Sequence, residues 1–377
     1  MTIPADTADF LIVGAGMAGA SLAYELGDAH TVTLLESEDQ PGYHATGRSA
    51  AFFSEIYGNE TIRALTAASR EFFEQPPAVF DEHALLEPRD CVVFAGRDDL
   101  QALRAQFAEL RHRVTGLSLE SADFALERVP VLRRSKVAGC LWERASQRID
   151  VHALLQGYLR GFRRRRGRLI TRARVTAARR HRGVWSVETT AGEFRARVLV
   201  NAAGAWADRV AALAGAAPLG LQPLRRTVCV IETETAEDCA NWAAVTDLDE
   251  SFYCIPEAGR LLLSPADETP SPAGDAYPED LDVAIAVDRL ETVTTLQVRR
   301  VVQQWAGLRT FASDRIPVVG FDPRLEGFFW CAGQGGYGIQ TAPALSRLAA
   351  ALARGSEPAA DLQAVEPAQL SPNRFVD

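Results

Sequence analysis

The apolar and polar positions near the N-terminus predict a strand, a turn, a helix and a second strand. One apolar run covers 10–13, apolar positions at helical spacing follow it, and a second apolar run covers 32–35. The turn before the helix contains Gly14, Gly16 and Gly19. This order is the βαβ unit of a dinucleotide-binding fold and predicts an α/β protein.

The same two periodicities recur along the rest of the chain. We expect further helices near 62–73, 152–162, 205–214 and 342–353. We expect further strands near 91–94, 184–188, 198–200, 226–232, 251–255, 260–263 and 328–332. The strands that look antiparallel cluster between about 225 and 265, whereas elements of the nucleotide-binding type occur at both ends and in the middle.

Both predicted domains are therefore discontinuous in sequence. We expect a nucleotide-binding domain of about 1–80, 148–218 and 318–377, and a substrate domain of about 81–147 and 219–317. The proline-rich segment 265–278 is expected to be an exposed loop. The arginine run 163–166 is expected at the C-terminal end of the helix before it, where basic side chains complement the helix dipole.

Composition and charge narrow the class of protein. Of the 377 residues, 47% are hydrophobic, which suits a soluble protein of two domains. The formal net charge of -9 disfavours nucleic acid as a partner. No apolar run is long enough to cross a bilayer and no signal-peptide pattern is present, so we expect a cytoplasmic protein, with peripheral membrane contact left open. The six cysteines lack metal-ligand and C-x-x-C spacing, so we expect free thiols and no metal site.

The glycines of the first turn have separate structural tasks. Gly14 permits the tight turn, Gly16 lets the backbone approach a pyrophosphate, and Gly19 lets the helix pack closely on the strand. Glu36 ends the second strand, where a carboxylate accepts hydrogen bonds from a ribose 2′-hydroxyl. Because a carboxylate there disfavours a 2′-phosphate, we predict FAD or NAD rather than NADP.

Two further segments rich in small residues bear on the choice between FAD and NAD. The first is 42–51, and the second is 333–341, directly after the strand predicted at 328–332. A turn between a strand and a helix presents backbone N–H groups that can stabilise negative charge on a reduced flavin ring. We therefore favour FAD; the alternative for the second segment is a tight turn without a ligand.

A set of segments together resembles the D-amino-acid oxidase/dehydrogenase superfamily of FAD enzymes, and within it the D-arginine dehydrogenase-like branch. The segments are VGAGMAGAS, QPGYHATGRSAAFF, VLVNAAGAWAD, PLGLQPLRR, LDESFY, WAGLRTF and GQGGYGIQT, followed by LSP from Leu370. They extend over nearly the whole chain. The resemblance implies an α/β fold with a Rossmann-like FAD-binding domain and a substrate domain whose large mixed, mostly antiparallel β-sheet faces the flavin.

The resemblance also implies which residues form the two sites, with FAD bound non-covalently. The expected cofactor contacts are Gly14, Gly16, Met17, Ala18, Gly19, Glu36, Ser37, His44, Ala45, Thr46, Arg48, Ser49, Ala50, Ala51, Val175, Ala203, Gly204, Trp206, Gly307, Arg309, Gly335, Gly336, Tyr337, Gly338, Ile339 and Gln340. The expected catalytic residues are Tyr57, Arg226, Tyr253 and Arg309. The expected lining of the substrate side-chain pocket is Phe52, Cys91, Gly336 and Tyr337. We expect His44 to be a loop histidine packed beside the cofactor rather than a base.

The expected chemistry starts from the carboxylate of an amino-acid substrate. A planar guanidinium holds a carboxylate through two hydrogen bonds, and the resemblance gives this task to Arg226 and Arg309. Arg225 and Arg226 are neighbours on a predicted strand, so only one of them can enter the pocket. We expect hydride transfer from Cα to flavin N5, and then hydrolysis of the imine to a 2-oxo acid and ammonia. The protein would supply orientation and electrostatics rather than a strong base.

Two departures from the D-arginine dehydrogenase pattern bear on the substrate side chain. Phe52 stands where that branch has a histidine, and Cys91 where it has an acid that faces a cationic side chain. Because a phenyl ring and a thiol do not stabilise a buried cation, we predict a preference for neutral or apolar D-amino acids. Lys136 is the single lysine and lies outside the flavin segments. A dehydrogenase with an acceptor such as a quinone is therefore favoured over an oxidase that activates oxygen with a lysine.

Two alternatives remain open at this point. One is an oxidoreductase of the same superfamily for secondary amines or glycine-type substrates, or for 2-hydroxy acids. The other is a non-catalytic flavoprotein that uses the fold alone. The paired arginines and tyrosines argue against the second alternative, because such a protein has no need of a carboxylate clamp.

Overall fold

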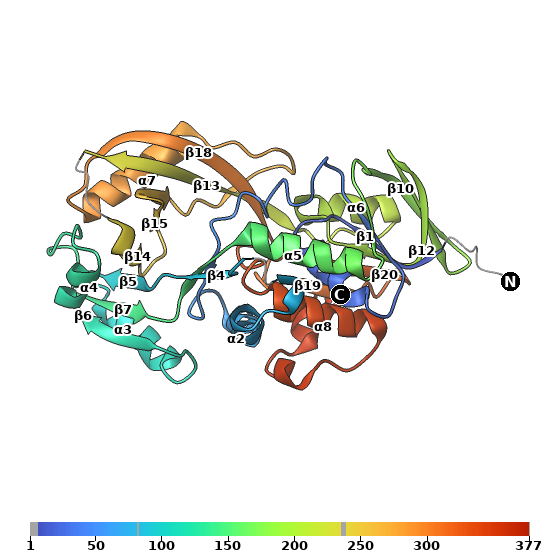
Figure 1. Ribbon diagram of the computed structural model, residues 1–377, viewed down its shortest axis with the longest axis horizontal. Coiled ribbons are helices and arrows are strands. Elements are labelled where there is room, and N and C mark those ends of the chain that lie inside the picture. The colour runs from blue at the N-terminus through green and yellow to red at the C-terminus, as the bar shows by residue number, and fades with distance from the viewer. Residues whose placement is uncertain (1–6, 81–82, 235–238, 377) are drawn as a thin grey trace.

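The computed structural model describes residues 7–80, 83–234 and 239–376 of the chain (Figure 1). The βαβ unit expected at the N-terminus consists of β1 (Ala8–Val13), α1 (Met17–Leu26) and β2 (Val32–Leu35). β1 pairs in parallel with β2 on one side and with β12 (Gly192–Asn201) on the other. Nearly all β1 and β2 side chains are buried, as in a parallel sheet covered on both faces.

The first sheet extends this unit in both directions. Its parallel part has the order β20-β12-β1-β2-β9, with β20 at Phe328–Ala332 and β9 at Arg168–Ile170. The strands β10 (Val175–His181) and β11 (Val184–Thr189) continue from β12 as an antiparallel meander. The strand β19 (Val318–Phe321) pairs antiparallel with β20.

Helices cover the two faces of the first sheet. α1, α5 (Val151–Arg164) and α8 (Ala342–Arg354) form one layer, and α6 (Ala207–Ala214) lies on the other side (Figure 1). Alternate residues of β1 follow this division, since Phe10 and Ile12 pack into the core with the first layer, and Leu11 and Val13 pack with α6. The two faces of the strand thus belong to two different hydrophobic cores.

The helix α5 shows why the arginine run lies where it does. Asp150 caps its N-terminus by accepting a hydrogen bond of 2.8 Å from the backbone N–H of Ala153. Arg163 and Arg164 occupy its last turn, as expected, and the helix ends there because Arg166 has a φ of 62°. The basic run therefore complements the helix dipole at this end.

The second sheet forms the other lobe of the molecule (Figure 1). Within the described residues its strand order is β17-β13-β16-β15-β14-β5-β7-β6. The strand β18 lies outside this linear order and pairs with β13. All pairings are antiparallel except that of β14 with β5. The bounds are β5 Cys91–Ala95, β6 Leu117–Ser121, β7 Gly139–Glu143, β13 Gln222–Thr233, β14 Ala244–Asp247, β15 Tyr253–Glu257, β16 Arg260–Ser264, β17 Thr269–Pro270 and β18 Val298–Phe311.

Three helices pack on the second sheet. α7 (Asp280–Val293) lies on β13 and β16, whereas α3 (Leu100–Leu110) and α4 (Ala122–Arg128) contact β6 and β7. A small sheet of β3 (Phe52–Phe53), β8 (Gln147–Ile149) and β4 (Leu86–Pro88) adjoins both lobes. The helix α2 (Glu60–Glu74) packs against α8. The remaining helices are α2 Glu60–Glu74, η1 Ala78–Phe80, η2 Gly204–Trp206, η3 Cys239–Asn241, η4 Ala360–Leu362, α9 Pro367–Leu370 and η5 Pro372–Phe375.

The expected α/β class with a large, mixed, mostly antiparallel sheet is confirmed, and the differences are local. The strand expected at 251–255 begins at Tyr253 and continues to Glu257. The segment 265–278 is mainly exposed, but it also contains β17, which pairs with β13. The long strand β18 was not predicted, because its polar first half hides the apolar alternation of a half-buried strand.

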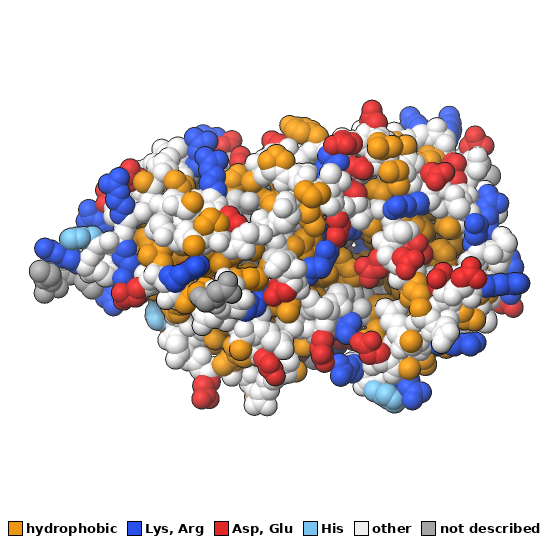
Figure 2. Space-filling model, turned by 180° about the vertical axis from the view of Figure 1, so that it is seen from behind, with side chains coloured by type: hydrophobic (Ala, Val, Ile, Leu, Met, Phe, Trp, Pro, Cys, Tyr) orange, Lys and Arg blue, Asp and Glu red, His pale blue; other side chains and the backbone are white. Residues whose placement is uncertain are grey.

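The surface and the cysteines bear on the predicted partners and metal site. Charged side chains of both signs are interspersed on the face in Figure 2. No described helix combines the length and the apolar character that a membrane span requires. All six cysteines lie in described segments, and none of them forms a disulfide there. Among the described residues no cluster of three or more histidine, cysteine or acidic side chains could hold a metal ion.

Candidate active site

A cavity of about 660 Å³ is lined by residues from both sheets. One group of lining residues follows the carboxyl ends of β1, β2 and β20, where open α/β sheets bind their ligands. Another group comes from the long strands of the second sheet, including Arg226, Val228 and Arg309. The cavity therefore joins the nucleotide-type motif to the candidate substrate residues.

The first glycine turn has no room for side chains. Gly14 has a φ of 101°, and a Cβ atom there would lie 2.4 Å from the carbonyl oxygen of Ala202. A Cβ atom on Gly19 would lie 1.8 Å from the carbonyl oxygen of Gly14, so this glycine does permit close packing of the helix on the turn. α1 begins directly after Gly16 and has no acidic residue in its first turn, which leaves its positive end suited to a phosphate group.

Glu36 is fixed at the end of β2. Its Oε2 accepts a hydrogen bond of 2.9 Å from the backbone N–H of Ala15, and its Oε1 accepts one of 3.0 Å from the N–H of Glu38. The side chain is buried and lines the cavity. Its carboxylate is thus held in one orientation next to the glycine turn, as a ribose-binding group requires.

The segment 42–51 forms a second wall of the cavity. Thr46 accepts a hydrogen bond of 3.0 Å from the backbone N–H of Met17, which ties the segment to the start of α1. The Nε2 of His44 lies 3.0 Å from Glu38, and its ring centroid lies 4.6 Å from that of Trp206. His44 is therefore packed beside the cavity, as expected.

The glycine-rich turn after β20 brings the backbone close to two candidate substrate residues. Gly333 and Gly335 have φ values of 69° and 54°. A Cβ atom on Gly336 would lie 2.8 Å from Nη1 of Arg309 and 3.2 Å from the hydroxyl of Tyr57. Any side chain larger than that of glycine at position 336 would displace the guanidinium group of Arg309. The turn is thus a close approach of backbone to the substrate side of the cavity.

Arg226 and Arg309 lie on the same face of the second sheet. The register of β13 and β18 places Leu224 opposite Arg309 and Gly307 opposite Arg226. The two arginines are therefore diagonal neighbours, two positions apart along the ladder. Gly307 lines the cavity, and a Cβ atom there would lie 3.3 Å from Cβ of Arg48. Arg309 is held by a hydrogen bond of 3.2 Å between its Nη1 and the hydroxyl of Tyr57.

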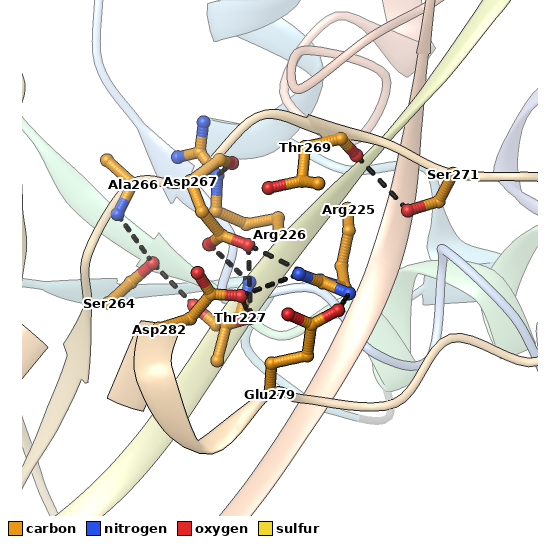
Figure 3. A network of polar contacts seen from close by, with 10 residues as sticks. All are labelled: Arg225, Arg226, Thr227, Ser264, Ala266, Asp267, Thr269, Ser271, Glu279 and Asp282. Carbon is orange, nitrogen blue, oxygen red and sulfur yellow. Dashed lines mark hydrogen bonds and ion pairs between the residues drawn. The ribbon is translucent and has the colours of Figure 1, made fainter. Parts of the chain in front are cut away.

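Arg225 points away from this site, as the alternation of a strand requires. Figure 3 shows it directed to Glu279 and Asp282, with which it forms ion pairs. Arg226 instead donates from Nε to the carbonyl oxygen of Asp267, at 2.8 Å. Burial, and then the nearby charge of Arg309, lowers the pKa of Arg226. The site therefore holds two like charges, one buried at Arg226 and one half-buried at Arg309, a condition that favours the binding of an anion.

The residues expected around the substrate side chain form an apolar wall behind the cavity lining. Phe52 and Cys91 pack against a buried cluster that contains Val228, together with Tyr253. Burial, and then the nearby charge of Glu143, raises the pKa of the Cys91 thiol well above its ordinary value. The thiol is therefore a neutral group in this wall. Among the described residues, the hydroxyl of Tyr253 is buried and has no hydrogen-bond partner.

Most of the predicted site residues line the cavity. Those that do are Gly14, Gly16, Met17, Ala18, Glu36, Ser37, His44, Ala45, Thr46, Arg48, Ser49, Ala50, Val175, Ala203, Gly204, Trp206, Arg226, Tyr253, Gly307, Arg309, Gly335, Gly336, Gly338 and Ile339. Those that lie behind the lining are Gly19, Ala51, Phe52, Tyr57, Cys91, Tyr337 and Gln340. The side chain of Gln340, for example, is bound to the backbone N–H of Ser54 and to Thr66, and so joins two segments of the fold.

Several lining residues were not predicted. They include Arg172, Arg174, Thr190 and Arg209 near Val175, and Gly274 and Ala276 from the segment expected to be only an exposed loop. Arg48 fastens that loop through a hydrogen bond of 3.0 Å to the carbonyl oxygen of Ala276 and an ion pair of 2.5 Å with Asp275. The sequence contains no local signal for this contact between distant segments.

These observations fit FAD. The glycine turn and the positive end of α1 suit a pyrophosphate, and the fixed carboxylate of Glu36 suits a ribose. The turn after β20 brings backbone to the same cavity from its other end. When bound, FAD supplies a two-electron acceptor.

Comparison with known proteins agrees with this fit. The family described as DAO, FAD dependent oxidoreductase, matches residues 9–352. Mitochondrial dimethylglycine dehydrogenase of Homo sapiens is 26% identical over 98% of this chain, which spans only 44% of that relative. Glycine oxidase of Geobacillus kaustophilus is 23% identical over 94% of this chain and 95% of its own length.

Solved structures show the same fold. The crystal structure of glycine oxidase from Geobacillus kaustophilus superposes with a TM-score of 0.85 at 22% identity, covering 99% of this chain and 100% of the other. That of L-proline dehydrogenase from P. horikoshii gives a TM-score of 0.83 at 18% identity and covers 98% of each chain. The fold, the cavity and the match over 9–352 lead to one conclusion: the chain belongs to the DAO family of FAD-dependent oxidoreductases.

Proposed function

We propose that this protein oxidises the Cα–N bond of D-amino acids with neutral or apolar side chains, as an FAD-dependent dehydrogenase. One observation carries the proposal: two guanidinium groups, the buried Arg226 and the half-buried Arg309, lie on one face of the second sheet at the cavity. Tyr57 holds Arg309, and the unpartnered hydroxyl of Tyr253 is free to meet a ligand. A guanidinium group binds a carboxylate through two parallel hydrogen bonds and so fixes its orientation.

The same charges prepare the substrate for oxidation. Two cationic groups beside the amine disfavour its ammonium form, so the neutral amine with its free lone pair is the species that reacts. Cα would give up a hydride, which bound FAD would accept, while the lone pair forms the C=N bond of an iminium cation, which then loses a proton to give the imine. Water hydrolyses the imine to a 2-oxo acid and ammonia. The protein's own task is to hold the carboxylate and thereby to fix the direction of the Cα–H bond.

The apolar wall of Phe52 and Cys91 supports the preference for neutral side chains, since neither group stabilises a buried cation. The preference for the D configuration rests on the resemblance to the D-arginine dehydrogenase-like branch. The preference for an acceptor such as a quinone over oxygen rests on Lys136, the single lysine, which is exposed and does not line the cavity. The roles given to the individual site residues are part of the same proposal.

The test is a panel of D- and L-amino acids mixed anaerobically with the oxidised flavoprotein. We expect D-leucine, D-methionine and D-phenylalanine to bleach the flavin faster than D-arginine or any L-amino acid. Air-saturated buffer should reoxidise the bleached enzyme slowly, and a quinone should do so quickly. Faster bleaching by D-arginine, or rapid peroxide formation in air, would contradict the corresponding part of the proposal.

The variant Arg309→Leu tests the carboxylate clamp directly. We expect a fall in kcat/KM of roughly a thousandfold. The variant removes one partner of the charge pair between Arg309 and the substrate carboxylate, and such a loss costs about 4 kcal/mol. Arg300→Leu is the matched control: this arginine lies on the same strand, is exposed and pairs with Glu232. Its flavin content and kcat/KM should stay unchanged. An Arg226→Leu/Arg309→Leu double variant that its best substrate still reduces at normal affinity would refute the clamp.

A second candidate is oxidation of secondary amines or glycine-type substrates. The names of two relatives favour it, dimethylglycine dehydrogenase and glycine oxidase. A carboxylate clamp would serve such substrates equally well. Including glycine, sarcosine and dimethylglycine in the same anaerobic panel separates the two candidates, because the apolar wall offers these small substrates little to bind.

A further inference from the structure

Arg226 has an acidic partner of its own. Its Nη2 lies 3.3 Å from Oε1 of Glu268, in the loop between β16 and β17. The same carboxylate binds Arg315 at both oxygens, through hydrogen bonds of 2.9 Å and 2.6 Å. Arg315 belongs to the loop between β18 and β19. Glu268 is thus shared between an arginine of the cavity and an arginine at the surface.

The two contacts of Glu268 differ in geometry. The contact with Arg315 is bidentate and short, and the contact with Arg226 is a single, longer one. The side chain of Glu268 is 35% exposed and that of Arg226 is 9% exposed, so the carboxylate reaches a buried charge from the surface side. The geometry allows the Glu268 carboxylate to break its contact with Arg226 while its two hydrogen bonds to Arg315 remain.

The loop is also fixed so that this contact can form. The carboxylate of Asp267 accepts hydrogen bonds from the backbone N–H and the hydroxyl of Thr227, at 2.6 Å and 3.0 Å (Figure 3). Ser264 donates to the carbonyl oxygen of Thr227 at 2.6 Å. The loop is therefore fastened to β13 one residue beyond Arg226, and Glu268 is presented to that arginine by a rigid support.

We propose that Glu268 is an internal counter-anion of Arg226 that the substrate carboxylate displaces, and that Arg315 holds Glu268 once it is displaced. This inference rests on the proposed carboxylate clamp. Glu268 then determines how tightly the enzyme binds carboxylates without taking part in the oxidation. It weakens substrate binding, and in return it neutralises a buried charge when no substrate is bound.

The charges of the site support this exchange. Although burial acts to raise it, the pKa of Glu268 is lowered, because Arg315 binds its carboxylate and the charges of Arg226 and Arg309 are near. Glu268 is therefore an anion at neutral pH. The substrate carboxylate can approach Arg226 only if the Glu268 carboxylate moves away, or else against the repulsion between the two anions. Removal of the Glu268 charge should therefore strengthen substrate binding.

The experiment measures the binding of 3-methylbutanoate, a monocarboxylate without an amine to oxidise, to the oxidised flavoprotein through the change in flavin absorbance. We expect Glu268→Gln to lower Kd by about fivefold, as for a partly exposed charge pair. The KM of the best amino-acid substrate should fall by a similar factor while kcat stays constant. Glu279→Gln, whose carboxylate pairs with Arg225 on the other face of β13, is the matched control and should change neither value.

Arg315→Gln gives the opposite sign. Without Arg315 the carboxylate of Glu268 has Arg226 as its remaining partner, so Kd should rise. In the Glu268→Gln/Arg315→Gln double variant this rise should disappear, because Arg315 acts through Glu268. A merely structural role would weaken binding in both single variants. Retained flavin absorbance and an unchanged melting temperature show that each variant is folded.

The outcomes separate this inference from the proposed function. Loss of 3-methylbutanoate binding in Arg226→Gln/Arg309→Gln is required by the clamp itself. If that loss is seen but Glu268→Gln binds the probe as weakly as the wild type or more weakly, the clamp stands and the counter-anion is refuted. If the arginine double variant still binds the probe normally, the clamp is refuted.

Discussion

The two ends of the cavity are built in different ways. The nucleotide end consists of backbone and small residues that are close together in sequence, such as Gly14, Gly16 and Glu36. The substrate end consists of long side chains from distant segments, with Tyr57, Arg226 and Arg309 meeting across two strands and a loop. The nucleotide end thus depends mainly on backbone geometry, whereas the substrate end depends on side chains that the tertiary fold must bring together.

The largest expected effect comes from a single methyl group at the nucleotide end. In Gly14→Ala the new Cβ would lie 2.4 Å from the carbonyl oxygen of Ala202, at a backbone φ of 101° that L-residues rarely adopt. We expect FAD occupancy to fall by at least about a hundredfold, since backbone strain of roughly 1–3 kcal/mol adds to this overlap with a carbonyl oxygen. The absorbance of the purified protein near the flavin maximum measures this.

Gly183→Ala provides the control for backbone strain alone. Gly183 also has a positive φ, of 82°, but no atom lies within 4 Å of its Cβ position. This variant should keep its full flavin content. A yellow Gly14→Ala protein with normal occupancy would show that the turn tolerates a side chain and that the nucleotide end is less rigid than the comparison requires.

The contrast between the two ends also explains what the sequence alone could predict. The turn at Gly14, the helix α1 and the strand β20 follow from local periodicity and turn chemistry, and β20 has the predicted bounds. The face of β13 that carries Arg226 follows from strand alternation. The pairing of Arg226 with Arg309 does not, because it depends on the register of β13 with β18, a strand whose own pattern is weak.

Other parts of the site had no signal in the sequence at all. Glu268 and Arg315 lie in two loops, and their contact depends on where those loops are fastened. The same is true of Asp275, which reaches Arg48 across the cavity. Such contacts between loops leave no periodic pattern in the sequence. The residues expected to bind the substrate carboxylate were predicted from the family resemblance, but the charged loop residues around them were not predicted.

A buried carboxyl supports the substrate end and makes it sensitive to pH. Glu143, at the end of β7, is 1% exposed; it accepts hydrogen bonds of 2.7 Å from the hydroxyl of Ser54 and from the backbone N–H of Glu55. These residues lead directly to Tyr57. Burial raises the pKa of Glu143 to about 7 despite these hydrogen bonds.

The sign of the pH effect follows from this shift. Between the ordinary value of 4.5 and about 7 the folded state binds the proton more tightly than the unfolded state, so this group's contribution to stability is lost as pH rises through that range. The loss amounts to about 3 kcal/mol. Glu143→Gln should remove this pH-dependent loss of stability. The amide cannot ionise, yet it can accept a hydrogen bond from the backbone N–H of Glu55 and donate one to the hydroxyl of Ser54, as the protonated acid does.

Denaturant unfolding at pH 5 and pH 8 measures the difference. The stability of Glu143→Gln relative to the wild type should increase by about 2.5 kcal/mol from the lower to the higher pH. The control, Glu188→Gln, replaces an exposed carboxyl of β11, and its relative stability should be the same at both pH values. Parallel curves for the wild type and Glu143→Gln would mean that Glu143 stays ionised in the folded protein.

The smallest expected effect concerns the apolar wall. Cys91→Glu places a carboxylate where the related D-arginine dehydrogenase-like branch carries an acid, so the ratio of kcat/KM for D-arginine to that for D-leucine should rise. We expect only about tenfold, roughly 1.4 kcal/mol. The register of β5 and β7 puts Glu143 opposite position 91, so two carboxyls would compete for ionisation in a buried place. Cys91→Gln, of similar size and without charge, should leave the ratio unchanged.

The neighbouring carboxyl offers a way to sharpen this last result. In Cys91→Glu/Glu143→Gln the new carboxylate no longer faces a like charge, so it should ionise more readily and the ratio should rise above that of the single variant. Steady-state kinetics with both amino acids at pH 8 measures it. If neither variant moves the ratio, position 91 lies too far behind the cavity lining to meet the substrate side chain. The substrate end would then select by the residues that line the cavity itself, in the same way as the nucleotide end.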